Sequence, residues 1–480
     1  MNGGRIRGIR PSSVLGLLSL TACASLAERP PLEPIPFHAV PTEEATELPG
    51  ASAAPPLELP EMEVTQTAEG LRVARVTVPF AMTTISLLSF PPLDDVGLAA
   101  AEPLASRLAH DYLREVAGPF DRLTWRGQGS ARGLRVESMD PDSSKGVQRL
   151  AKAVCGAEKA LEDYVKARRD ALQSFVSADG YDDISINLAR IGRYGSEHPW
   201  AQGTATRVTY MAGISREKML ELWPRLFDLS SAVLVVIGRD PPAAEAIAEQ
   251  FCALAPPEPV EAKEPLEVPA FREEGGHRFH AMWYRGDQVE MRALHTGPGT
   301  RSPDYLAFSV ISDLLDDGFG SEADRALRHD SGASYGFHGR FYRRQSSSEI
   351  LWGGSVAPRF GYRTFELHRD QIRSLVEEEI TPERLKAILV RRHGRYLRRL
   401  DDTAWMASAL AECMLLDIPV GAECLLPDES ALTPTELRAT AERWLHPEQL
   451  DWALVGTSAH VFNRLQFEGT IYRYEKERAE

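Results

Sequence analysis

Few side chains in this sequence are arranged for catalysis. A zinc peptidase helix needs two histidines four residues apart to hold the metal, and an adjacent glutamate to activate water. Neither His-x-x-Glu-His nor His-Glu-x-x-His occurs anywhere in the 480 residues. No Ser-His-Asp or Cys-His set stands in a catalytic motif either. The sequence therefore predicts no catalytic residue and no metal ligand in this chain.

Two clusters contain residue types that bind ligands in other proteins. His277 and His280 have a spacing that suits a metal site on a helix or turn, but the polar run from 273 to 280 offers no third ligand. We therefore expect a solvated loop there. The most basic stretch would spread around several faces of a helix, and we expect it to pair with acids such as those at 377–379 or to line an inner cavity. It consists of Arg391, Arg392, His393, Arg395, Arg398 and Arg399.

The length and composition indicate a protein of more than one domain. A chain of 480 residues is well above the usual size of a single domain. With 43% hydrophobic and 26% charged residues, it can bury a large core. The formal net charge of -15 argues against a nucleic-acid partner, because such surfaces are basic.

The first residues have the pattern of a targeting segment. A basic start is followed by the apolar run Val14–Leu20, which is too short to span a bilayer. The next residues, Leu20-Thr21-Ala22-Cys23, resemble a bacterial lipobox, in which the cysteine is acylated and becomes the new N-terminus. We therefore predict a lipoprotein signal peptide at 1–22 and lipid attachment at Cys23; the alternative is an ordinary secretory signal. Ala24, rather than Asp, favours the outer membrane.

Two segments rich in proline and acidic residues divide the remaining chain. Residues 23–60 are expected to be an extended tether, and residues 256–272 a linker between domains. The predicted domains are therefore 61–255 and 273–480. Within them the apolar spacing predicts helices at 97–116, 143–154, 303–315, 360–379 and 382–400, and strands at 70–76, 82–90, 133–139, 289–295, 334–342 and 349–356.

The two halves repeat one unit. Residues 215–238 and 433–456 align without a gap, at an offset of 218 residues. Each copy starts with an N-cap residue, Ser215 or Thr433, and continues with a helix and a strand that closes on glycine. Two copies of one α+β domain, with helices packed on a largely antiparallel sheet, are the predicted fold.

Four cysteines follow Cys23 in the sequence. Pairs of Cys155 with Cys252, and of Cys413 with Cys424, would each stay within one predicted domain. An exported protein allows disulfides, but buried free thiols are an equal alternative. The sequence leaves this choice open.

Three segments in the right order resemble the pitrilysin/insulinase (M16) peptidase family. They are Arg193–Trp200 followed by Gly203-Thr204, the turn at 314–321, and Leu327–Tyr335 with its Leu-Arg and Tyr elements. The resemblance covers most of residues 62–460. It implies two M16-type domains of the LuxS/metallohydrolase-like kind, in agreement with the internal repeat.

The zinc site departs from the family pattern. The positions that correspond to the family's His-x-x-Glu-His are Ala100, Pro103 and Leu104, and Phe175 stands near the further glutamate ligand. None of these side chains can ligate a metal.

The family's substrate-binding pair is retained. The resemblance gives Arg328 and Tyr335 the roles of holding the substrate backbone and stabilising a developing oxyanion. His329 stands where the family often has glutamate. As structural alternatives, Arg328 would form an ion pair at a helix end and Tyr335 would be a half-buried strand residue.

The resemblance thus implies a non-catalytic subunit of a two-chain zinc metallopeptidase. It would be lipid-anchored in the cell envelope, facing the periplasm, and would bind peptide substrate together with a partner that bears His-x-x-Glu-His and the zinc. The alternatives are a scaffold without peptidase work, and a self-sufficient metallopeptidase with an unrecognised zinc site.

Overall fold

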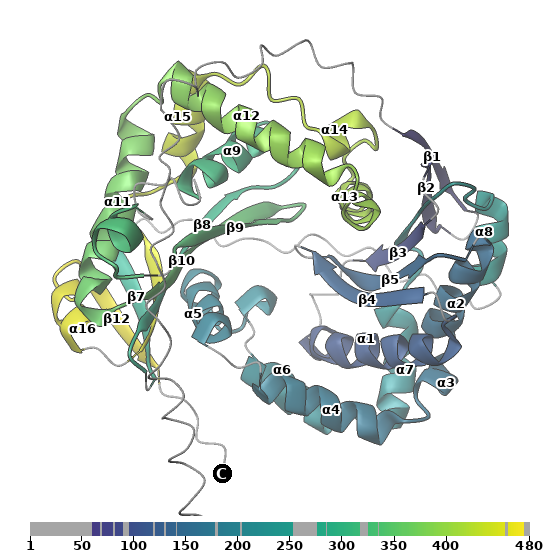
Figure 1. Cartoon of the computed structure of the whole chain (residues 1–480). Helices are drawn as coiled ribbons and strands as arrows, with labels where there is room; N and C mark the ends of the chain where they lie inside the picture. Colours follow the sequence, from purple (N-terminus) through teal and green to yellow (C-terminus); the bar gives the residue numbers. More distant parts are fainter. Residues whose placement is uncertain are drawn as a thin grey trace, which may run out of the picture. The chain divides into compact units, whose positions relative to one another are not determined.

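Two six-stranded sheets organise the protein, as the computed structural model shows (Figure 1). The structure describes residues 60–474, except 68–69, 80–81, 90–95, 119–120, 129–130, 141, 178–180, 202–203, 253–275, 285, 317–324, 335 and 457–458. The predicted signal peptide, Cys23, the tether before residue 60 and the linker at 256–272 lie outside the described residues. None of the described helices is long and apolar enough to cross a membrane.

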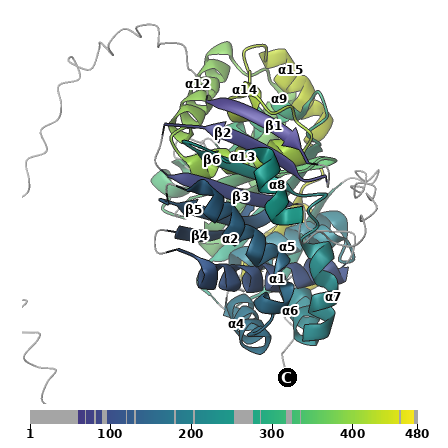
Figure 2. The same cartoon turned by 90° about the vertical axis from the view of Figure 1, so that its right-hand side faces the viewer.

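The first sheet is built from the N-terminal half of the chain. Its strand order is β1-β2-β6-β3-β5-β4, which Figure 2 shows from top to bottom, and only β2 and β6 pair in parallel. The strands are β1 (Glu61–Gln66), β2 (Arg72–Thr77), β3 (Thr83–Ser89), β4 (Asp121–Gln128), β5 (Ala131–Ser138) and β6 (Val233–Gly238).

The second sheet is built from the C-terminal half and has the order β12-β7-β11-β8-β10-β9. Here β7 pairs in parallel with both β11 and β12, and the other pairs are antiparallel. The strands are β7 (His277–Trp283), β8 (Val289–Pro298), β9 (His338–Arg343), β10 (Ser347–Val356), β11 (Asp451–Gly456) and β12 (Gly469–Tyr474).

The two sheets confirm the predicted repeat. β6 lies between a parallel neighbour and an antiparallel neighbour, and so does β11 in the other sheet. The helices α7 (Arg216–Leu226) and α15 (Pro434–Trp444) precede these strands at the same offset. Their predicted caps are present, since Ser215 accepts from the Lys218 amide and Thr433 forms a capping box with Glu436. The α+β fold class is therefore confirmed.

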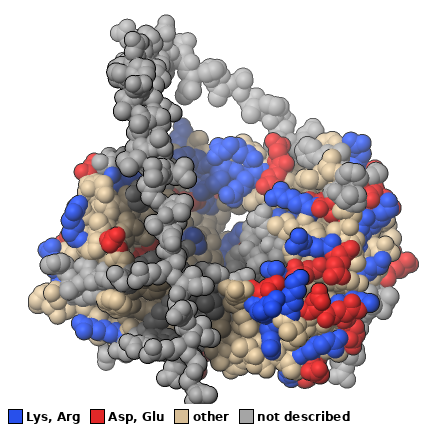
Figure 3. All heavy atoms as spheres, turned by 60° about the horizontal axis from the view of Figure 1, so that its bottom comes forward, with Lys and Arg blue, Asp and Glu red and all other residues tan. Residues whose placement is uncertain are grey.

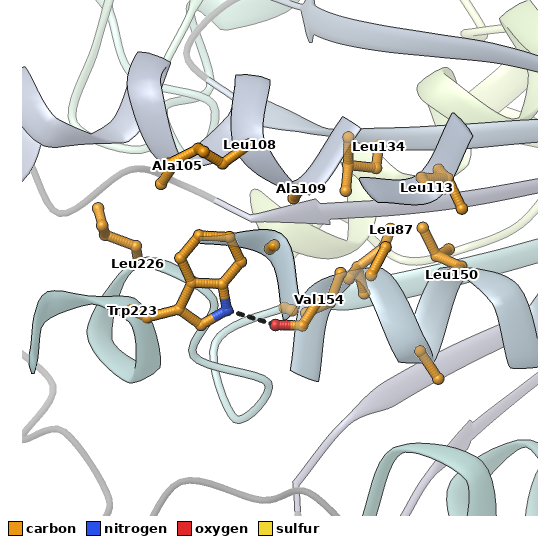
Figure 4. Close-up of a cluster of buried hydrophobic side chains, with 14 of the residues drawn as sticks. Leu87, Ala105, Leu108, Ala109, Leu113, Leu134, Leu150, Val154, Trp223 and Leu226 are labelled. Carbon is orange, nitrogen blue, oxygen red and sulfur yellow. Dashed lines mark hydrogen bonds between the residues drawn. The ribbon is translucent and has the colours of Figure 1, made fainter. Parts of the chain in front are cut away.

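One face of each sheet is covered by helices of its own half. The first sheet packs on α1 (Val96–Val116), α2 (Ser143–Cys155), α7 and α8 (Ala244–Cys252), with α3 (Ala157–Ala160), α4 (Tyr164–Ser177) and α6 (Thr204–Gly213) behind them. The second packs on α9 (Tyr305–Leu315), α11 (Gly361–Glu377), α12 (Pro382–Arg399), α15 and α16 (Ala459–Leu465). In Figure 4, side chains of α1, including Ala105 and Leu108, meet Leu226 and Trp223, whose indole Nε1 donates to the Val154 carbonyl at 2.6 Å.

The other face of each sheet is covered by a helix from the opposite half. α13 (Thr403–Leu415), which leads to the short α14 (Ala422–Leu425), packs on β3 and β6, and α5 (Tyr181–Tyr194) packs on β8 and β11 (Figure 1). Strand alternation explains how both faces become apolar. Leu234 of β6 faces α1, while Val233 and Val235 face α13. The boundaries predicted between the halves stay a prediction.

One disulfide joins Cys413 of α13 to Cys424 of α14. It is the second of the two pairs that the sequence allowed. Cys155 is half-buried at the C-terminus of α2, and the side chain of Cys252 lies outside the described part, so the pair of Cys155 with Cys252 stays a prediction.

Candidate functional site

The helix that should carry a zinc site is a core helix. α1 includes Ala100, Pro103 and Leu104, and both Pro103 and Leu104 are buried. Leu104 is 0% exposed and belongs to the same apolar cluster as Leu98 and Leu108. The side chains of Ala100, Pro103 and Leu104 offer no donor atom to a metal, so these positions do not fit a zinc ion.

The acidic residue on this helix turn is engaged within the protein. Glu102 is 6% exposed, accepts from the Ser106 hydroxyl at 2.8 Å and lies 3.6 Å from Arg132 Nε. The cavity beside it measures about 20 Å³, room for about one water molecule. Among the described residues, no group of three His, Cys, Asp or Glu side chains could hold a metal ion. Phe175 lies on α4, but its side chain is outside the described part.

Arg328 of the predicted substrate-binding pair lies on a short helical turn, Arg325–Asp330. Arg328 is half-buried on this turn, and Tyr335 is outside the described residues, so their common role stays a prediction. Hydrogen bonds hold the backbone on either side of Tyr335. Ser334 bridges Val356 of β10 and donates its hydroxyl to the Ser355 carbonyl at 2.7 Å, and the Gly336 amide donates back to the Ser334 hydroxyl. The sheet therefore fixes where the backbone enters and leaves position 335.

The segment after residue 193, which carries part of the family resemblance, forms a cluster of aromatic side chains. Tyr194 ends α5, and its ring stacks on His198 and meets Trp200 edge-on, with centroids 4.9 and 5.3 Å apart. Gly195 has a φ of 89°, a left-handed conformation that favours glycine and turns the chain after the helix. In this chain, the Tyr-Gly and His-Pro-Trp elements have a structural role at the end of α5.

α5 is held on the second sheet by a buried carboxylate. Glu349 of β10 is 0% exposed and accepts from Arg190 at 2.9 Å and from the Tyr194 hydroxyl at 2.6 Å. Arg344 Nη1 lies 2.9 Å from the other side of the carboxylate, and its guanidinium covers the Trp200 ring at 3.8 Å.

These charges set the protonation states at the α5 interface. Burial alone would raise the pKa of Glu349, but the positive charges of Arg190 and Arg344 lower it to about 2. Burial, and then the charge of Glu349, raises the pKa of the Tyr194 phenol well above its usual range, so this group remains a donor. The carboxylate is thus ionised and balanced by two arginines.

The contacts of α13 with the first sheet are also polar at their edges. Thr403 and Thr84 share a hydrogen bond of 2.7 Å between their hydroxyl groups. Arg135 of β5 donates to Ser408, and Glu412 accepts from Arg343 Nε of β9 at 3.1 Å. α13 is therefore bonded to strands of both sheets.

The solvated loop predicted around His277 and His280 is wrong, because both residues lie in β7 and are buried. An odd spacing in a strand sends two side chains to opposite faces. His277 meets Phe365 of α11, whereas His280 stacks on Tyr472 and lies beside Gly192 of α5. They therefore cannot share a metal ion.

The basic cluster forms part of α12, and its partners differ from those expected. Arg392 donates to Glu429 and Asp313, rather than to the acids at 377–379. Arg395 shares Asp313 at 2.7 Å. The other predicted role is confirmed, because residues of this helix line a cavity.

Comparison with known proteins agrees with this fold. The family model of the peptidase M16 inactive domain matches residues 213–389. None of the curated proteins matches the chain. A peptidase M16 inactive domain from Pseudomonas fluorescens has a similar structure, with a TM-score of 0.70, 18% identity, and coverage of 83% of this chain and 98% of its own. A protease from Helicobacter pylori has a TM-score of 0.69 at 12% identity, over 83% of this chain and all (100%) of its own.

A further similar chain comes from complex III2 of Candida albicans with Inz-5 bound. Its TM-score is 0.68 at 13% identity, over 85% of this chain and 99% of its own. At these identities, the structural likeness shows the shared fold.

Proposed function

We propose, because the family model of the peptidase M16 inactive domain matches residues 213–389, that this chain is a non-catalytic subunit of an M16-type zinc metallopeptidase. One observation carries the proposal: the two-sheet fold is present, while the turn of α1 that would bind zinc has Pro103 and Leu104 buried at the ligand positions. A chain that retains the body of a peptidase without its metal site can act on peptides only beside a chain that has one.

The partner in this proposal is an M16 relative with His-x-x-Glu-His. The partner would supply zinc and the water-activating glutamate, and this chain would close the chamber and bind the substrate backbone through Arg328 and Tyr335. The bonds of Ser334 and Gly336 support this role, because they fix the backbone on both sides of Tyr335. An arginine fork and a phenol are suitable donors to a peptide carbonyl.

Attachment to a membrane is part of the same proposal. The lipobox-like sequence ending at Cys23 supports a lipid anchor, and the predicted tether at 23–60 would connect this anchor to the folded part. We place the protein at the outer membrane, facing the periplasm. Replacing Cys23 by Ser should release the chain from the membrane fraction.

The test of the proposed function is recovery of the tagged, lipidated protein from its native membranes, with mass spectrometry of the co-purified chains. We expect a near-stoichiometric relative that bears His-x-x-Glu-His, and peptide cleavage by the pair but not by either chain alone. Stoichiometric zinc in the isolated chain, with chelator-sensitive cleavage by that chain, would instead establish a self-sufficient enzyme.

A scaffold is the second candidate function, favoured by the likeness to a chain of complex III2 from Candida albicans. Two variants separate it from the first. Arg328→Ala and Tyr335→Phe should lower the activity of the reconstituted pair if this chain binds substrate. Arg363→Ala, at an exposed position on α11, is the matched control. Unchanged activity in all three variants would favour the scaffold function.

A further inference from the structure

A cavity of about 550 Å³ lies within the C-terminal half, between α9, β9, α12 and α13. Its volume is in the range of pockets that hold small organic ligands. The lining residues on α12 are Arg392, Arg395, Tyr396 and Arg399, which follow each other at helical spacing and so share one face of the helix. No step of the proposed peptidase function uses this cavity.

One wall of the cavity is aromatic. Tyr305 of α9, Phe341 of β9, Tyr396 of α12 and Trp405 of α13 all line it. Phe341 lies 6.0 Å from Tyr305 between ring centroids, and Arg399 is placed 5.8 Å above the Trp405 ring. Such a wall can bury a planar or aliphatic group, since aromatic rings contribute large apolar areas.

Nearly all charges inside the cavity are already balanced. Arg343 is bonded to Glu412, and Arg392 and Arg395 share Asp313. Burial raises the pKa of the Tyr305 phenol to about 12, so its hydroxyl remains a donor. Asp428, which also lines the cavity, is exposed, accepts from the Ser430 amide at 3.0 Å and has no ion pair with a described residue.

Two guanidinium groups retain donors for a ligand. Arg399 has the Trp405 ring as its side-chain contact and no carboxylate within 4.0 Å among the described residues. Arg395 uses Nη2 for Asp313 and remains 40% exposed, so its other nitrogens are accessible. They lie one turn apart on α12, close enough to act on one anionic group.

We infer that this cavity binds a small carboxylate with an aromatic or aliphatic body, the carboxylate at Arg399 and Arg395 and the body against Trp405, Tyr396 and Tyr305. A charge-assisted bond to a guanidinium fork gives direction to the carboxylate end, and the aromatic wall binds the apolar end. A peptide that ends in an apolar residue and a fatty acid both have this chemistry. The site is independent of the proposed partner, because all its residues lie in this chain.

The test is calorimetric titration of the purified whole chain with three probes. The first is N-acetyl-Leu-Phe with a free carboxylate, the second is the same dipeptide as its C-terminal amide, and the third is decanoate. We expect the free acid to bind and the amide to bind at least about 10-fold more weakly, because a hydrogen bond to a charged group contributes about 1.5–3 kcal/mol. Binding of decanoate alone would keep the inferred chemistry and assign the ligand to the fatty acids.

Variants on one helix locate the site. Arg399→Ala should weaken binding of the probe about 10-fold or more, and Arg399→Lys should restore part of it, since the charge remains but the fork is lost. Arg398→Ala is the matched control, because Arg398 is exposed and does not line the cavity. Equal binding of acid and amide, no binding of any probe, or equal affinity in the Arg399 and Arg398 variants would overturn the inference.

Discussion

The buried carboxylate that holds α5 gives the sharpest prediction. Glu349→Gln keeps the shape of the side chain but leaves Arg190 and Arg344 without their counter-charge in a site where Glu349 is fully buried. The change of the Glu349 pKa from 4.5 to about 2 corresponds to a stabilisation on the order of 3 kcal/mol. Removing one partner of a buried ion pair generally costs about 3–5 kcal/mol, so the two lines of reasoning agree.

The assay is equilibrium unfolding in urea at pH 7, together with hydrogen exchange of the amides in α5. We expect the variant to lose about 3 kcal/mol and α5 to exchange faster than helices of the outer layer. Glu366→Gln is the matched control, because Glu366 is partly exposed and lies 3.8 Å from Arg363. Its effect should stay below about 0.5 kcal/mol. Equal stability of the two variants, with unchanged exchange in α5, would refute the reasoning.

Wild type and Glu349→Gln should also differ in how their stability depends on pH. The folded-state pKa of Glu349 lies below its ordinary value, so its contribution is fully present above about pH 4.5 and is lost as the pH falls toward about 2. Glutamine has no such contribution. The difference in stability between wild type and Glu349→Gln should therefore shrink over this window, and a constant difference would contradict the assigned cause.

Three further predictions concern single elements. Leu104→His should bring no zinc binding and should destabilise the fold by about 3 kcal/mol, since it places a polar ring in a fully buried apolar site; zinc analysis and thermal unfolding would check both. Asp402→Ala should cost about 1 kcal/mol, because Asp402 caps α13 by accepting from two amides, while Asp401→Ala should cost little. Replacing Cys413 and Cys424 by Ala should cost about 3 kcal/mol for the loop of 11 residues, measured in urea under oxidising conditions.

The repeat was predictable because it depends on local signals. Ser215 and Thr433 have N-cap chemistry, apolar helices follow them, and each strand that comes next is closed by glycine. That Ala100, Pro103 and Leu104 cannot ligate a metal also follows from the sequence, because zinc needs particular donor atoms at particular spacings. The strands β6 and β11 then appear at the centres of their sheets, where both faces are buried.

The packing of α5 and α13, which each cover the sheet of the opposite half, could not be predicted from the sequence pattern. α13 is buried around nearly its whole circumference and so lacks the apolar stripe that marks a surface helix. The partners of α5 lie more than one hundred residues away, as for Arg190 and Glu349, and no local pattern encodes such a pair. The basic residues of α12 were correctly seen, but Asp313 and Glu429 were found only through the fold.

Charged side chains at the surface say less about the fold than charged side chains in the interior. On the face shown in Figure 3, basic and acidic side chains lie interspersed. Ion pairs between neighbouring turns of one helix also occur along α11 and α15. Such pairs contribute little each, so the sequence can vary there without affecting the fold.

The exchange of α5 and α13 bears on how the molecule originated. Moved by the offset of the repeat, the range of α5 becomes 399–412, which overlaps α13, so the two helices are counterparts in the two copies. Each copy therefore contributes the equivalent helix to the sheet of the other copy, as the protomers of a domain-swapped dimer do. The single chain has the form of such a dimer after gene fusion. A cut between the copies would leave two fragments that still hold each other, because each needs the other's helix to cover an apolar sheet face.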